Sequence, residues 1–158
     1  MDHWHWGMFI FGKFLENSEP TFSNFHWWGW HKSLGLIILV LVFLRLGARL
    51  ASGAPPPVAL PRLQMRVASA VHASLYLLLL AVPVTGWIAS SATGLPVSVF
   101  NFFDVPALWR EDAAIEKVMF RVHGNLATML VVLSVLHLGA ALHHHFVKGN
   151  DVLRRMLP

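Results

Sequence analysis

The chain contains no cysteine, and only 13% of its 158 residues are charged. Without cysteine it has no disulfide, no Cys-ligated zinc, no iron–sulfur cluster and no thiolate chemistry. A water-soluble domain usually carries about 25% charged residues, whereas 56% of this chain is hydrophobic and its mean hydropathy is +0.57. The composition therefore predicts a protein integral to a membrane. It excludes most soluble enzyme folds and a sizeable catalytic domain outside the membrane.

Long apolar runs occur at residues 33–51, 67–91 and 119–146. Each is long enough for a helix to cross a hydrocarbon core of about 30 Å. A fourth run, at residues 3–15, would rise only about 20 Å as a helix and is too short to cross by itself. We predict an all-α fold, a four-helix transmembrane bundle in a single domain over residues 1–158, with the first helix shortened at its N-terminus. We also predict a short surface helix in the loop at 93–117.

Basic residues concentrate at one end of the predicted bundle, which carries Arg45, Arg49, Arg62, Arg66, Lys148, Arg154 and Arg155. The positive-inside rule places this end, and with it both termini, in the cytoplasm. These residues lie between apolar runs rather than on a soluble face. The formal net charge of +4 therefore indicates membrane topology and no nucleic-acid partner, and membrane lipid is the expected surrounding.

Histidine is unusually abundant, with ten residues in an environment where unpaired polar groups are costly. His123 and His137 lie fourteen residues apart on one predicted helix, which corresponds to about 21 Å of rise and about 40° of rotation. They would share a face near opposite leaflets. Two planar cofactors stacked across a membrane would need axial nitrogens placed in this way, because imidazole binds haem iron through a neutral nitrogen. The alternative is that both histidines only bond to neighbouring carbonyls.

The neighbouring helix offers His31 at its outer end, level with His123. Arg45 follows fourteen residues later on nearly the same face. Its guanidinium would bind a haem propionate there, or anchor the helix at the membrane boundary. Gly35, one turn from His31, would let a flat ring approach the backbone, although helix packing explains a small residue equally well.

Several short motifs occur together in this order. They are HKSLG at 31–35, RLGAR at 45–49, VHASLY at 71–76 with the later P-x-x-G-W at 83–87, VHG at 122–124 and VLHLGAALHHHF at 135–146. In combination they resemble the prokaryotic cytochrome b561 family, four-helix di-haem b electron-transfer proteins of the bacterial inner membrane. The resemblance implies that His31 and His123 ligate the iron of an outer haem and His137 that of an inner haem. It also implies ubiquinone or a similar quinone as electron partner.

The start of the chain departs from that pattern. In the family, the first helix opens with a histidine followed by tryptophan, and this histidine is the partner of His137. The segment at 7–9 resembles the middle of that helix, so the expected ligand would fall just before Met1. We therefore expect a chain that begins late and holds the inner haem weakly. His3, His5 and His72 are the alternative sixth ligands; otherwise the resemblance makes His72 a non-ligand near the inner haem.

The leading hypothesis is a b-type cytochrome that transfers electrons between a donor at the outer face and the quinone pool. Relatives of one type oxidise superoxide at that face, so superoxide:quinone oxidoreductase is the candidate enzyme activity. However, the outer side has six carboxylates against five cations, which weakens steering of an anion. A haem-bearing anchor subunit of a dehydrogenase or hydrogenase is the alternative, and a membrane protein without haem is a third. The sequence does not determine the donor or the oligomeric state.

Overall fold

The computed structural model describes residues 4–18, 21, 25–52 and 61–147. This part of the chain contains four helices, α1 (Trp4–Glu16), α2 (Phe25–Ser52), α3 (Arg62–Ala92) and α4 (Ala113–Phe146), and two strands, β1 (Val97–Val99) and β2 (Phe103–Val105). Only α2, α3 and α4 are long and apolar enough to cross a membrane. The predicted helical fold is thus confirmed for four helices, whereas a bundle of four membrane-spanning helices is not.

The long helices contain the predicted apolar runs and begin earlier than those runs. Helix α4 begins at Ala113 because the Asp112 carboxylate accepts hydrogen bonds from the backbone N–H groups of Ala114, at 2.9 Å, and Ile115, at 3.1 Å. Such a cap satisfies donors that have no partner within the helix. Helix α3 continues through Pro83 without a break from Arg62 to Ala92.

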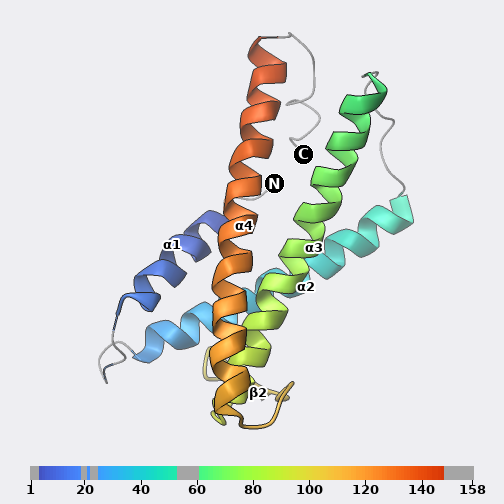
Figure 1. The fold of residues 1–158 in the computed structure, drawn as a ribbon. Helices are drawn as coiled ribbons and strands as arrows, with labels where there is room; N and C mark the ends of the chain where they lie inside the picture. Colours follow the sequence, from blue (N-terminus) through green and yellow to red (C-terminus); the bar gives the residue numbers. More distant parts are fainter. Residues whose placement is uncertain (1–3, 19–20, 22–24, 53–60, 148–158) are drawn as a thin grey trace.

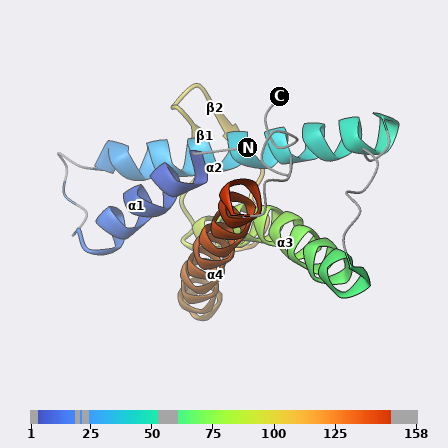
Figure 2. The ribbon, with the colours of Figure 1, turned by 90° about the horizontal axis from the view of Figure 1, so that it is seen from above.

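Helices α3 and α4 form the most extensive helix pair and run antiparallel (Figure 1). Helix α2 crosses this pair obliquely, and α1 packs against α2 and α4 (Figure 2). The contact between α1 and α2 is aromatic: the rings of Phe11 and Phe14 lie 5.7 and 6.0 Å from that of Trp27. The short α1 is thereby placed beside the N-terminal half of α2, where His31 lies.

The segment between α3 and α4 contains a β-hairpin, so the prediction of a short surface helix there was wrong. Strands β1 and β2 pair antiparallel, with Val97 opposite Val105. Their Val- and Phe-containing sequences favour extended backbone. The turn places Phe100 at φ 47° and Asn101 at φ 60°, and two positive φ values match the twist of a tight hairpin. The fold is therefore mostly helical rather than purely α.

A buried serine fastens this hairpin to α2. The Ser33 hydroxyl donates to the Gly29 carbonyl at 2.8 Å and accepts from the Phe100 N–H at 2.8 Å. Ser33 is fully buried, so these bonds lie away from solvent. Because Ser33 is two residues beyond His31, the hairpin holds the part of α2 that carries this histidine.

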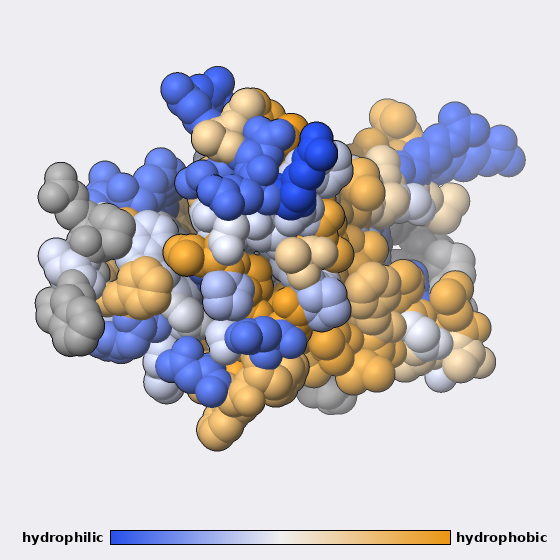
Figure 3. All heavy atoms as spheres, turned by 90° about the horizontal axis from the view of Figure 1, so that it is seen from below, coloured by the Kyte–Doolittle hydropathy of each residue, from blue (hydrophilic) through white to orange (hydrophobic). Residues whose placement is uncertain are grey.

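The surface of the long helices is largely apolar, as expected for lipid-facing helices. Seen from the end that bears the hairpin, hydrophilic residues are interspersed with hydrophobic ones over that end, and hydrophobic residues continue along the flank (Figure 3). Large apolar side chains such as Leu44, Leu77 and Leu136 are exposed. The cytoplasmic orientation of the termini stays a prediction, since Lys148, Arg154 and Arg155 lie outside the described residues.

Candidate functional site

Two histidines from different helices face each other at the hairpin end of the molecule. His31 of α2 and His123 of α4 have ring centroids 6.1 Å apart and ring planes at 87°. Two imidazoles that share one metal ion lie roughly 6 Å apart between centroids, since each metal–nitrogen bond takes about 2.0–2.1 Å. The pair predicted from the sequence is therefore brought together at the spacing of two axial ligands.

The His123 ring is held by a backbone carbonyl of α3. Its Nδ1 lies 2.8 Å from the Val82 carbonyl oxygen, which can only accept, so Nδ1 carries the hydrogen. This hydrogen bond sets the tautomer of a neutral imidazole and leaves Nε2 unprotonated, as required for a metal ligand.

Glycines on two neighbouring helices make room for these rings. A Cβ added at Gly86 of α3 would lie 3.0 Å from both Cε1 and Nδ1 of His123, and one added at Gly12 of α1 would lie 3.1 Å from Cε1 of His31. A side chain at either position would push on an imidazole. Gly35, which the sequence suggested for the approach of a flat ring to the backbone, contacts neither imidazole, since an added Cβ there would have nothing within 4 Å.

The pair fits a haem better than it fits a metal ion bound by protein alone. The Nδ1 atom of His31 is buried and has no hydrogen-bond partner, although buried polar atoms are nearly always paired. No group of three or more His, Cys, Asp or Glu side chains in the described ranges could hold a metal ion. A metal bound here by two histidines would need its remaining ligands from a cofactor, which is what a porphyrin supplies.

A second histidine pair joins α3 and α4 further along the helices. The rings of His72 and His137 lie 5.0 Å apart at 77°. They touch edge to face and are about 1 Å closer than two imidazoles sharing one metal. The structure therefore brings His72, one of the considered partners, to His137. His5 lies in the first turn of α1, and its side chain is outside the described part of the structure.

Arg45 lies in a small pocket between α2 and α3. The pocket, of about 260 Å³, is lined by Arg45, Ala48, Arg49, Ser52 and Tyr76. The guanidinium of Arg49 lies 5.8 Å from the centroid of the Tyr76 ring. Arg49 and Tyr76 were not selected from the sequence, although Arg49 is one helical turn from Arg45 and Tyr76 one turn from His72.

A larger cavity, of about 800 Å³, opens between the start of α2 and the hairpin. Its lining is mainly aromatic and contains Thr21, Phe25, His26, Gly29, Trp30, Phe100, Asn101 and Phe102. The Trp30 and Phe100 rings pack edge to face at 5.5 Å. The cavity thus lies beside the residue that precedes His31 in the chain, and the described residues that line it include no Lys, Arg, Asp or Glu.

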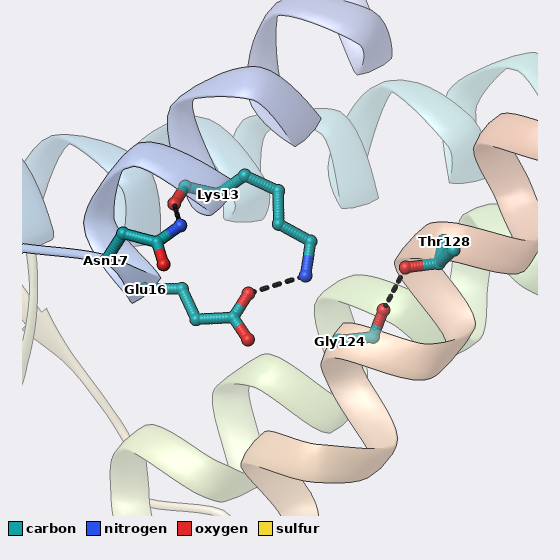
Figure 4. Close-up of polar contacts among 5 residues, drawn as sticks. All are labelled: Lys13, Glu16, Asn17, Gly124 and Thr128. Atoms are coloured by element: carbon teal, nitrogen blue, oxygen red, sulfur yellow. Dashed lines mark hydrogen bonds and ion pairs between the residues drawn. The ribbon is translucent and has the colours of Figure 1, made fainter.

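Other polar groups near these elements bond within their own helices (Figure 4). Lys13 and Glu16 form an ion pair at 2.6 Å, and Asn17 donates to the Lys13 carbonyl at 2.8 Å. The Thr128 hydroxyl donates to the Gly124 carbonyl at 2.9 Å. These bonds link neighbouring turns of one helix, whereas the bond from His123 to the Val82 carbonyl joins two helices.

Comparison with known families shows to which family the chain belongs. The family model of prokaryotic cytochrome b561 matches residues 1–158. The chain belongs to the prokaryotic cytochrome b561 family. This confirms the resemblance found in the sequence, and with it a multi-pass membrane cytochrome of electron transport, for which the family implies haem b.

Curated relatives agree with this assignment. Cytochrome b561 homolog 2 of Escherichia coli (strain K12) is 38% identical over 98% of this chain and 86% of its own length. Cytochrome b561 homolog 1 of the same organism is 33% identical over 81% of this chain and 73% of its own length. A protein of Yersinia pestis named probable superoxide oxidase CybB is 31% identical over 81% of this chain and 73% of its own length.

Proposed function

We propose that this b561-family cytochrome binds one haem b between His31 and His123 and passes electrons between it and a quinone. The facing pair of imidazoles at 6.1 Å, from α2 and α4, carries the proposal. Bound haem would supply one-electron chemistry. The protein residues would provide the ligands, fix their orientation and exclude water.

Residues around the two histidines position their rings. The Val82 carbonyl accepts from Nδ1 of His123 and so leaves Nε2 as the nitrogen that can bind a metal. Ser33, bonded to the hairpin, fixes the turn of α2 that carries His31. Gly12 and Gly86 let both rings lie against neighbouring helices without a clash.

We further propose that His137 ligates a second haem, with His72 as the partner that the described structure favours. Their 5.0 Å contact supports this choice. It also implies that the rings must separate by about 1 Å to admit an iron ion. The second haem should therefore bind more weakly than the first, because part of its binding energy is spent on that movement.

For the electron partner we propose a quinone of the bacterial inner membrane at the aromatic cavity beside Trp30. A cavity of about 800 Å³ is large enough for a ring-sized ligand, and aromatic rings such as Trp30 and Phe100 offer flat apolar surfaces to it. Among the described residues the lining has no Lys or Arg, which steering of superoxide into this cavity would need. A quinone is therefore a better match than superoxide for this cavity.

Haem quantitation on single variants tests the ligand assignment. His31→Ala and His123→Ala should each lose one haem per chain and the corresponding low-spin signal, because no other described imidazole lies at that pair. His26→Ala, a histidine on the same helix as His31, should keep full haem content. Full haem content in both ligand variants, or a purified protein without the absorption bands of haem b, would refute the proposal.

A further inference from the structure

The pocket of Arg45 and Arg49 has the composition of an anion site. Two guanidinium groups from successive turns of α2 line it together with the Ser52 hydroxyl, and Tyr76 of α3 forms part of its wall. Arg49 is oriented by the face of the Tyr76 ring at 5.8 Å, within the range of a cation–π contact. Two arginines, a serine and a tyrosine are therefore among the residues that line a volume of about 260 Å³.

No carboxylate among the described residues balances these charges. In the described ranges, no carboxylate forms an ion pair with Arg45 or Arg49, and both side chains are exposed. A guanidinium at the edge of a membrane gains from an oxyanion that it can bind through two parallel hydrogen bonds. The two guanidinium groups of the pocket are thus available to bind an anion such as a phosphate group.

The surroundings indicate where this anion comes from. Leu41 and Leu44, up to one turn before Arg45 on α2, and Leu77, next to Tyr76, are 55%, 65% and 68% exposed. Such residues contact acyl chains in a membrane-spanning protein. Basic pockets between transmembrane helices commonly bind the headgroups of anionic lipids.

We propose that this pocket binds the phosphate of an anionic phospholipid, whose acyl chains follow the exposed leucines toward the membrane centre. The site is separate from the described haem-ligand candidates, because none of His31, His72, His123 and His137 lines it. Arg49 lies within electrostatic reach of His72, so bound lipid would also place a negative charge near the second histidine pair. The lipid proposal does not depend on which residues ligate haem.

The single tyrosine of the chain gives a direct probe of the pocket. Protein labelled with 3-fluorotyrosine has one protein ¹⁹F resonance, from Tyr76. It would be recorded on the haem-loaded, dithionite-reduced protein in a neutral detergent during titration with phosphatidylglycerol. We expect a saturable shift with phosphatidylglycerol and none with phosphatidylcholine or inorganic phosphate at equal concentration.

Charge-removing variants locate the effect. Arg45→Gln and Arg49→Gln should each weaken phosphatidylglycerol binding about fivefold, as expected for one arginine near a lipid phosphate. Arg62→Gln, which removes the same charge from the start of α3 outside the pocket, should bind like the wild type. Equal weakening in Arg62→Gln would show diffuse attraction and overturn the proposal. An equal response to inorganic phosphate, or no response to phosphatidylglycerol, would also overturn it. Lipid binding only after haem removal would overturn it too, because it would indicate that a haem carboxylate occupies the pocket.

Discussion

Gly86→Ala tests whether the fit between α3 and His123 matters for haem binding. The new Cβ would lie 3.0 Å from Cε1 and Nδ1 of His123, whereas ordinary contacts begin at 3.4 Å. The ring would have to move away from α3 by about 0.4 Å. Because Val82 lies one turn from Gly86 on the same helix, this movement would stretch the Nδ1–Val82 hydrogen bond from 2.8 Å toward the limit of about 3.2 Å.

The expected cost follows from that bond. A neutral intramolecular hydrogen bond contributes about 0.5–1.5 kcal/mol net, so weakening it should reduce affinity for the first haem by about fivefold. Alanine is also the better helix former by up to about 1 kcal/mol, so the free energy of unfolding should not fall. Loss of haem without loss of fold stability would separate a local effect at His123 from general damage.

The measurement is the rate of haem transfer from the purified protein to excess apomyoglobin, together with the low-spin electron paramagnetic resonance spectrum. We expect transfer of the first haem to become about fivefold faster in Gly86→Ala, with a changed low-spin signal. Gly47→Ala is the matched control, since an added Cβ there meets nothing within 4 Å. An unchanged transfer rate and spectrum in Gly86→Ala would refute the reasoning.

Two further predictions concern the second histidine pair and the hairpin. His72→Ala should release the second haem while the first remains, and His5→Ala should keep both haems, as measured by pyridine haemochrome. Loss of the second haem only in His5→Ala would show that His72 is not its ligand. Ser33→Ala should leave the Phe100 N–H without its acceptor at a cost of about 1–3 kcal/mol, seen as a lower melting temperature and faster amide exchange at Phe100. Ser98→Ala is the control, because the Ser98 hydroxyl makes a long 3.4 Å contact with the Phe103 carbonyl. Equal effects in the two variants would contradict the role of Ser33.

The helical regions were predictable because they depend on local properties of the chain. Apolar runs of about twenty residues report a membrane span through transfer energy alone, and the runs at 33–51, 67–91 and 119–146 all fall within observed helices. The placement of His123 and His137 on one helix likewise follows from helical geometry. The hairpin was missed because its strands have three residues each, and segments this short carry little periodicity.

The contacts between helices depended on tertiary packing. Sequence spacing placed His31 level with His123, but only the packing of α1 against α2 brought Gly12 to His31. The Val82 carbonyl has no counterpart in a sequence pattern, since every residue has such a group. Arg45 also acquired its surroundings this way, because Tyr76 comes from another helix. Hydrophobicity and helical period are properties of single segments, whereas these contacts depend on the relative positions of two helices, which are set by side-chain packing along their whole interface.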